Sequence, residues 1–245
     1  MEQIWLTIPV VIFAGIVRGF SGFGFAAIAV VGLNLVLTPQ QSVALVLSLD
    51  LICSINLFKM ARQQADIDTL KKLILGAILG IPIGYCILQL IPAEILKLLI
   101  CICILGLSLL LLSEFNPFNP QKLKTKIGFG LASGAGTASA SVGGPMIVYY
   151  MLSSGLNTTT QRATMILFFI TSELLAICTL IIGGTVDSTV LKGVLILILP
   201  TIIAVQYGQV LFKKKPPQSL KSFALPVMMV VATLGIINSS FILIS

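Results

Sequence analysis

The sequence predicts an all-α polytopic membrane protein made of two inverted repeats, each a glycine-broken re-entrant helical hairpin plus three transmembrane helices. Composition, the succession of apolar segments and the distribution of basic residues predict this fold class. Hydrophobic residues make up 57% of the 245 residues and charged residues only 9%, whereas a soluble domain carries about 25% charged residues. The composition therefore indicates a lipid bilayer as the surroundings of most of the chain.

Apolar segments of about 20 residues, enough to cross a ~30 Å hydrocarbon core, recur along nearly the whole sequence. No soluble domain fits between them. Six segments have the length of a single span, and these are 40–60, 70–91, 94–113, 160–183, 188–211 and 221–243. Two longer segments, 4–37 and 126–155, are interrupted by glycine-rich stretches near 18–24 and 134–145. The N-terminus shows no basic region and no cleavage site, so we expect it to begin the mature membrane domain.

The two glycine-broken segments occupy equivalent places in the chain. Each opens a set of four segments, and each is followed by a turn and another span. Both contain two glycines four residues apart, starting at Gly15 in the first segment and at Gly130 in the second. We therefore expect an internal duplication, with a first membrane repeat at 1–118 and a second at 119–245 that together form one transport domain.

The basic residues favour one topology. If all eight segments crossed fully, eight basic residues would lie on one side and six on the other. If both broken segments turn back, only Lys97 and Lys192 remain on one side, and the other side holds Lys59, Arg62, Lys71, Lys72, Lys122, Lys124, Lys126, Arg162, Lys213, Lys214, Lys215 and Lys221. The positive-inside rule prefers the second arrangement. Each half then has an odd number of crossings, so the halves face opposite ways as in many secondary transporters, and both termini lie outside. The count itself requires only that 126–155 turn back, and 4–37 follows by symmetry.

Several function classes do not fit the composition. The net charge of +7 lies beside the spans without interleaved aromatic residues, so we expect no nucleic-acid partner. The absence of histidine excludes a Ser-His dyad and the His-Glu-x-x-His zinc site. Paired aspartate motifs for magnesium are missing as well, so we expect no enzyme, no cofactor and no metal. A passive anion channel remains an alternative to a carrier.

Small residues outside the breaks are expected to serve packing. The five cysteines lie in apolar runs without the paired spacing of a disulfide framework, and these are Cys53, Cys86, Cys101, Cys103 and Cys178. Gly76 with Gly80, and Gly183 with Gly184, are likewise interpreted as helix-packing pairs.

The two breaks predict a binding site. Non-helical backbone within a membrane must be buried in protein or line a water-filled cavity. Each break starts a new half-helix, near Phe23 and near Gly144, whose free N–H groups and dipole attract negative charge. We therefore predict that a small oxyanion binds where the breaks meet; the alternative is that the small residues only allow close packing. The candidate residues are Arg18, Ser21, Gly22, Phe23, Gly24, Thr137, Ser139, Ser141, Gly143 and Gly144.

Ionisable residues at membrane depth are rare, and they usually mark a pathway or pair with one another. In this chain they are Arg18, Asp50 and Glu173. Arg18 would add positive charge to the anion site. One or both acids are candidates to carry a coupling proton, and the alternative is a structural ion pair between Arg18 and an acid. Arg162, at the start of a span, is interpreted as a topology or headgroup anchor in preference to a ligand.

Three motifs stand at or beside the two breaks: Gly15-x-x-x-Gly19-x-x-Gly22-x-Gly24, Val142-Gly143-Gly144-Pro145 leading into Val148-Tyr149-Tyr150-Met151, and Gln161-Arg162-Ala163-Thr164. With them the chain resembles the sulfite exporter TauE/SafE family (the 4-toluene sulfonate uptake permease family) over essentially its full length. The resemblance implies transport of sulfur-containing anions, such as sulfite or organosulfonates, across a prokaryotic inner membrane. Other small organic anions, including carboxylates, are the alternative. Phe25 stands where the family commonly has a further glycine, and the second break is longer and rich in Ser and Ala, so the exact anion stays open.

Overall fold

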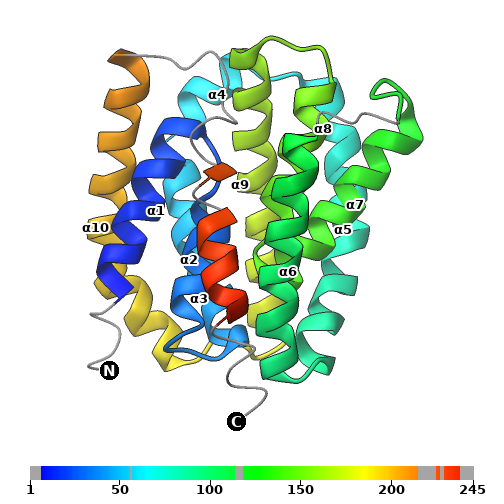
Figure 1. Cartoon of the computed structure of the whole chain (residues 1–245). Coiled ribbons are helices and arrows are strands. Elements are labelled where there is room, and N and C mark those ends of the chain that lie inside the picture. The colour runs from blue at the N-terminus through cyan, green and yellow to red at the C-terminus, as the bar shows by residue number, and fades with distance from the viewer. Residues whose placement is uncertain (1–6, 56, 114–117, 215–224, 227–228, 238–245) are drawn as a thin grey trace.

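The computed structural model describes residues 7–55, 57–113, 118–214, 225–226 and 229–237. All regular secondary structure in these residues is helical (Figure 1). The labelled helices are α1 Ile8–Ser21, α2 Phe25–Leu33, α3 Pro39–Ile55, α4 Phe58–Gln64, α5 Ile67–Leu90, α6 Ala93–Leu112, α7 Leu123–Ala140, α8 Gly143–Ser153, α9 Thr158–Ile182 and α10 Ser188–Lys214. Residues 229–237 are helical as well. The all-helical prediction is therefore confirmed for the described residues. The predicted span 221–243 lies partly outside them.

Four helices of the described chain are long and apolar enough to cross a membrane, namely α5, α6, α9 and α10. The bent pair α3 and α4 adds a fifth if it forms one span. Large apolar side chains project outward from these helices, among them Leu79 on α5, Ile182 on α9 and Leu195 on α10. Such surfaces are suited to contact with lipid chains, so the protein is a multi-pass membrane protein.

Polar side chains cap the starts of three long helices. Asp66 accepts hydrogen bonds from two amides in the first turn of α5, and Asn157 accepts one in the first turn of α9. At α10, Asp187 accepts from the Val190 amide at 2.9 Å and from the Gln41 side chain at 2.8 Å. These bonds hold the pKa of Asp187 below its ordinary value, and the bond from the Val190 amide has the larger effect. The caps satisfy amides that lack a partner within the helix.

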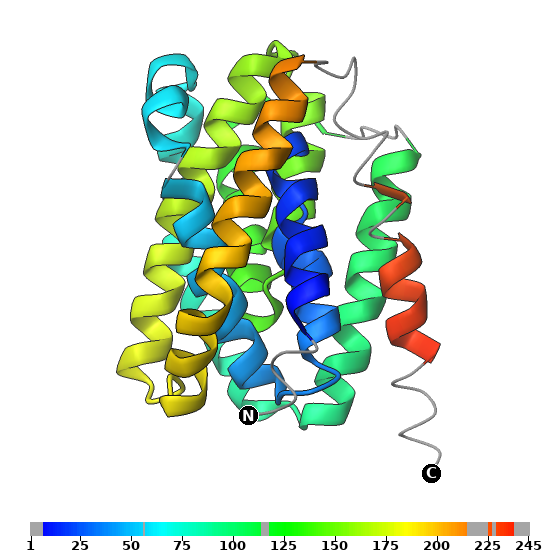
Figure 2. The same cartoon turned by 90° about the vertical axis from the view of Figure 1, so that its left-hand side faces the viewer.

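The two glycine-broken segments each form a pair of short helices that run in opposite directions. In Figure 1, α1 rises from the end of the molecule opposite α4 and α2 returns to that end, whereas α7 starts at the α4 end and α8 returns there. In Figure 2, turned by 90°, α1 again rises toward the end of the molecule that carries α4. Left-handed residues make the reversals possible, with Gly22 at φ 83° and Gly24 at φ 95° in the first and Ser141 at φ 56° in the second.

Small residues let two helix pairs approach at backbone distance. A Cβ on Gly76 or Gly80 of α5 would collide with the backbone of α7, at Ile127 and Leu131. The predicted packing role of Gly76 and Gly80 is therefore confirmed. Gly19 of α1 lies equally close to the backbone of α10 at Val205, and Gly15 lies against the Ala204 side chain.

The other pair of glycines behaves differently. Gly183 lies against the Tyr85 ring, as a packing residue would. Gly184 has φ 71° and open space around its Cβ position, so the packing prediction is wrong for this residue. It serves the turn after α9, because a glycine adopts positive φ without steric conflict. Among the cysteines, Cys53 and Cys101 are buried as expected, whereas Cys86, Cys103 and Cys178 point outward.

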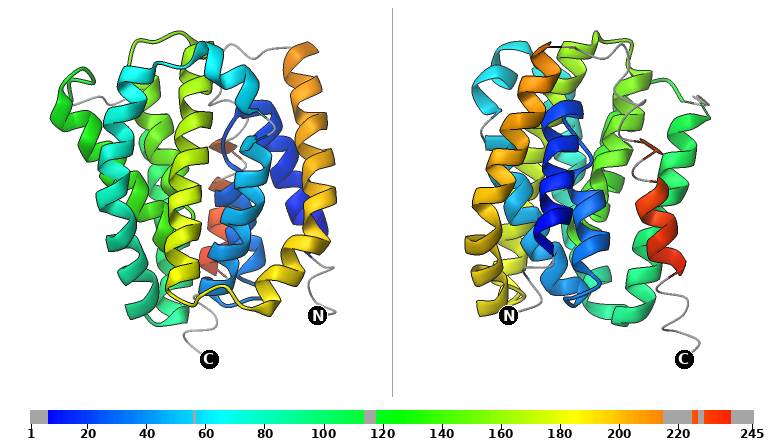
Figure 3. Two further views of the ribbon diagram at one scale, coloured as in Figure 1. Left: turned by 180° about the vertical axis from the view of Figure 1, so that it is seen from behind. Right: turned by 60° about the vertical axis from the view of Figure 1, so that its left-hand side comes forward.

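The helix pairing crosses between the two halves of the chain. Helix α1 packs on α10 and α7 packs on α5, so each opening helix lies against a span of the other half. Helices α3 and α9 contact each other (Figure 3). Each of these two central helices contributes residues to the cavity between the breaks.

Candidate functional site

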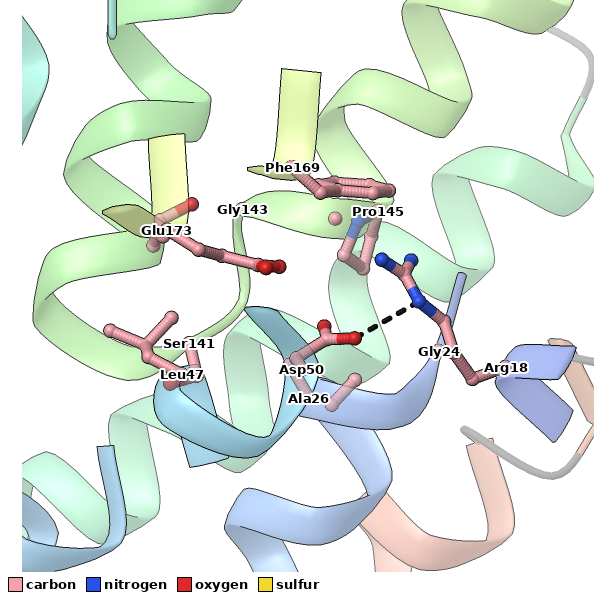
Figure 4. Close-up of a pocket in the computed structure, with 13 residues that line it drawn as sticks. Arg18, Gly24, Ala26, Leu47, Asp50, Ser141, Gly143, Pro145, Phe169 and Glu173 are labelled. Carbon is pink, nitrogen blue, oxygen red and sulfur yellow. Dashed lines mark ion pairs between the residues drawn. The ribbon is translucent and has the colours of Figure 1, made fainter. Parts of the chain in front are cut away.

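A small cavity lies where the two breaks approach α3 and α9 (Figure 4). Its volume is about 20 Å³, which corresponds to room for roughly one water molecule. The lining residues are Arg18, Gly24, Ala26, Ala27, Leu47, Asp50, Thr137, Ser141, Gly143, Gly144, Pro145, Phe169 and Glu173. The cavity therefore draws on both broken segments and on two of the spans.

Two helix N-termini converge on this cavity. Gly24 and the first-turn residues Ala26 and Ala27 of α2 line it on one side, and Gly143 and Gly144 of α8 line it on the other. First-turn amides have no acceptor within their own helix, and the helix dipole adds positive potential at the same point. The geometry that the sequence predicted, two half-helix starts facing one space, is present.

The local sequence explains how each opening helix ends. In the first break, the Gly22 amide donates to the Arg18 carbonyl at 2.8 Å while Gly22 is left-handed. In the second, the Val142 amide donates to the Gly136 carbonyl at 3.0 Å around a left-handed Ser141. A glycine usually takes that position, because a side chain there is strained by about 1–2 kcal/mol. Since Ser141 lines the cavity, the strained position carries a hydroxyl group at the site.

Arg18 is held from several sides. Its Nε lies 2.9 Å from Asp50 Oδ1, its Nη1 donates to the Gly22 carbonyl at 2.6 Å, and its Nη2 donates to Ser54 Oγ. The guanidinium also stands 4.7 Å from the centre of the Phe169 ring. Only 1% of the Arg18 surface is exposed. The alternative of a structural ion pair therefore holds for Asp50, and the dashed line in Figure 4 marks it.

Glu173 is the second carboxyl group of the cavity. It is 2% exposed and lines the cavity together with Asp50. Its Oε2 has no hydrogen-bond partner among the described residues. One guanidinium thus shares the cavity with two buried carboxyl groups.

The predicted candidates divide into two groups. Those that line the cavity are Arg18, Gly24, Asp50, Thr137, Ser141, Gly143, Gly144 and Glu173. Those that do not line it are Ser21, Gly22, Phe23 and Ser139. Ser21 Oγ is hydrogen-bonded to the backbone of the first break, and Ser139 Oγ donates to the Ala135 carbonyl at 2.8 Å. These residues belong to the breaks but do not line the cavity.

Sequence reasoning missed part of the site. Phe169 and Leu47 line the cavity, and Ser54 accepts a hydrogen bond from Arg18. Helical spacing was the available indication, because Phe169 precedes Glu173 by four residues and therefore shares its helix face. Leu47 precedes Asp50 by three residues on α3 and follows the same rule.

Arg162 lies beside the first break, although it is distant in sequence. It is 4% exposed, and its Nη2 donates to the Gly19 carbonyl at 3.2 Å. Its guanidinium stands 4.3 Å from the centre of the Phe212 ring, and its side chain packs on Gly22. The side chain is thus buried against the end of α1, and its role as a topology or headgroup anchor stays a prediction.

Comparison with known proteins adds one match. A family model described as Sulfite exporter TauE/SafE matches residues 7–234. No curated protein and no solved structure matches the chain. The matched range contains both breaks, α3, α9 and every residue that lines the cavity.

Proposed function

Because the chain belongs to the sulfite exporter TauE/SafE family, we propose that it is a secondary transporter that moves small sulfur-containing anions across the inner membrane. Sulfite and organosulfonates of the sulfoacetate type are the proposed substrates. The observation that carries the proposal is the convergence of two helix N-termini and the buried Arg18 on one cavity. Free amides and a guanidinium together are suited to hold an oxyanion.

The proposed topology places the halves 1–118 and 119–245 in inverted orientation. The opposed directions of the two hairpins and the cross-half pairing of α1 with α10 and α7 with α5 support it. The basic residues on α4 and at the ends of α5, α7, α9 and α10 gather at one end of the molecule. We propose that this end faces the cytoplasm and that both termini lie outside.

Alternating access is the proposed mode of transport. A cavity of about 20 Å³ is too small for an organosulfonate, so the hairpins must separate before the substrate enters. Movement of one hairpin relative to α3 and α9 would open the site toward one side at a time. The enclosed cavity favours a carrier over a passive channel.

Proton coupling follows from the charges around the cavity. Arg18 and Asp50 neutralise each other, so an ionised Glu173 would leave a negative charge beside the bound anion. Two like charges about 4 Å apart repel each other by roughly 4 kcal/mol at an effective dielectric constant of about 20. A protonated Glu173 removes this repulsion and can donate a hydrogen bond to the anion. Binding of the anion and binding of the proton therefore favour each other.

The test is transport in proteoliposomes that contain purified wild-type protein, Glu173→Gln or Asp50→Asn. Glutamine resembles the protonated carboxyl, so Glu173→Gln should keep counterflow exchange of the anion and lose stimulation by a pH gradient. Asp50→Asn should impair both activities, because it leaves Arg18 without its counter-charge. Undiminished proton-driven flux in both variants would remove the coupling proposal, and the absence of counterflow in the wild type would favour a channel.

The substrate class is tested separately by thermal unfolding. Purified protein should be stabilised by sulfite, thiosulfate, sulfoacetate or taurine more than by carboxylates of matched size. Ligands that bind only the folded state raise the unfolding temperature, and the increase grows with the ratio of ligand concentration to Kd. Stabilisation by carboxylates alone would overturn the assignment to sulfur-containing anions.

A further inference from the structure

A second cavity lies at the α4 end of the molecule, away from the central site. Its volume is about 230 Å³, roughly ten times that of the central cavity. The start of α4, the first turn of α9 and the end of α10 enclose it, with Lys59, Met60, Arg162, Gln209, Phe212 and Lys213 among its lining residues. The exposed Lys59 and Lys213 show that the cavity reaches the surface, while the buried Arg162 forms its inner part.

The charge of this cavity is unbalanced. Lys59, Arg162 and Lys213 line it, and among the residues that the structure describes no carboxylate does. Asp66, the acid closest in sequence to Lys59, accepts hydrogen bonds from amides in the first turn of α5. Three cations around one cavity create a positive potential there, which favours the binding of an anion.

Arg162 gives the second, independent indication. It is 4% exposed and has no salt-bridge partner, and its Nε has no hydrogen-bond partner within the described part of the chain. Its Nη2 is bound to the Gly19 carbonyl, and its Nη1 reaches only the Met60 sulfur at 3.7 Å. The Phe212 ring and a single carbonyl partly stabilise the guanidinium, but a buried charge of this kind normally has a full counter-charge.

We propose that this cavity is an anion-binding site, distinct from the central one, that holds a tetrahedral oxyanion group between Arg162, Lys59 and Lys213. The volume accommodates a sulfate- or sulfonate-sized group, and the arginine supplies a directional donor while the lysines supply point charges. A free anion from solution and the phosphate of a lipid headgroup share this chemistry. Because Arg162 contacts Gly19 and Gly22, occupancy of the site acts on the end of α1, which also carries Arg18 of the central cavity.

The test uses the reactivity of the lysines themselves. Wild-type protein is treated with an amine-acylating reagent in lipid-free detergent, and modification at each lysine is quantified by mass spectrometry. Sodium sulfate or inorganic phosphate, compared with sodium chloride at equal ionic strength, should slow acylation of Lys59 and Lys213 at least about threefold. Lys122 and Lys124 are matched controls, because they are exposed on α7 or at its start, near the same end of the molecule, and line no described cavity. Their rates should not change.

Two further arms identify the source of the anion and the role of Arg162. Protection in nanodiscs of phosphatidylglycerol but not of phosphatidylcholine, without added salt anion, would assign the site to a lipid headgroup. In Arg162→Gln, with folding checked by thermal unfolding and gel filtration, the protection should disappear. Equal rates at Lys59 and Lys213 under all conditions, or equal protection of Lys122 and Lys124, would overturn the proposal. The readout needs no transport, so the site and the proposed function can fail separately.

Discussion

At the scale of single residues, one buried arginine organises the central site. Arg18 joins the first break to α3 through Gly22, Asp50 and Ser54, and its guanidinium faces Phe169 of α9. Among the described residues, the ion pair with Asp50 leaves Glu173 as the cavity carboxyl group without an ion-pair partner. The two acids therefore differ in the structure: Asp50 is paired with Arg18, and Glu173 is the better candidate for the proposed coupling proton.

The ion pair is open to a double-mutant cycle. Arg18→Met leaves a buried carboxylate unpaired and should lower the free energy of unfolding by about 3–5 kcal/mol. Arg18→Met combined with Asp50→Asn removes both charges and should recover part of this loss. Denaturant unfolding in detergent measures the two single variants, Arg18→Met and Asp50→Asn, and the double variant. If the double variant is destabilised by the sum of the single effects, the two residues are not coupled as the 2.9 Å contact requires.

At the scale of helices, glycine determines which helices pack closely together and where the chain reverses direction. Gly76 and Gly80 bring α5 against the backbone of α7, and Gly22 and Gly24 reverse the first hairpin. The same residue type therefore serves two functions that composition alone does not separate. The distinction is steric, because the first two positions have no room for a Cβ and the second two adopt φ values that side chains disfavour.

Substitution by alanine distinguishes these uses at the α5–α7 contact. Gly80→Ala places a methyl group against the Leu131 carbonyl and should destabilise the protein by about 1–3 kcal/mol. Gly128→Ala on α7 meets open space and should be neutral or stabilising by up to about 1 kcal/mol, since alanine favours helix. Thermal unfolding in detergent compares the two. Equal effects at both positions would argue against this close packing of α5 on α7.

At the scale of the whole molecule, the pairing of opening helices with spans of the other half links the two breaks. Helices α3 and α9 contact each other, and each contributes an acid to the cavity, so the halves meet at the site. Movement of either hairpin would therefore change the surroundings of both carboxyl groups. This arrangement gives the proposed coupling between opening and protonation a structural basis.

The proposed topology predicts which ends share a compartment. Single cysteines at Lys122 and Thr159, introduced in a variant whose native cysteines are replaced by alanine, should react with an impermeant maleimide from the same side of the membrane. A cysteine at Ser188 should react from the other side. These positions are exposed at the start of α7, at the start of α9 and at the start of α10. Labelling of Lys122→Cys and Thr159→Cys from different sides would disprove the hairpin formed by α7 and α8.

The sequence alone determined the membrane class, the two glycine-broken segments and the pair of half-helix starts. Hydropathy and glycine spacing are local properties, and in a bilayer the backbone must satisfy its own hydrogen bonds, so the chain has few alternatives. It also singled out the acids and Arg18 as a set, because charges at membrane depth are rare.

Only the tertiary structure decided how these residues are used. It paired Arg18 with Asp50, left Glu173 without an ion-pair partner in the described part of the chain and placed Phe169 in the cavity wall. It also buried Arg162 beside the first break, more than a hundred residues away along the chain. Partners of this kind depend on which helices pack together, and that choice rests on shape complementarity between faces that periodicity does not reveal.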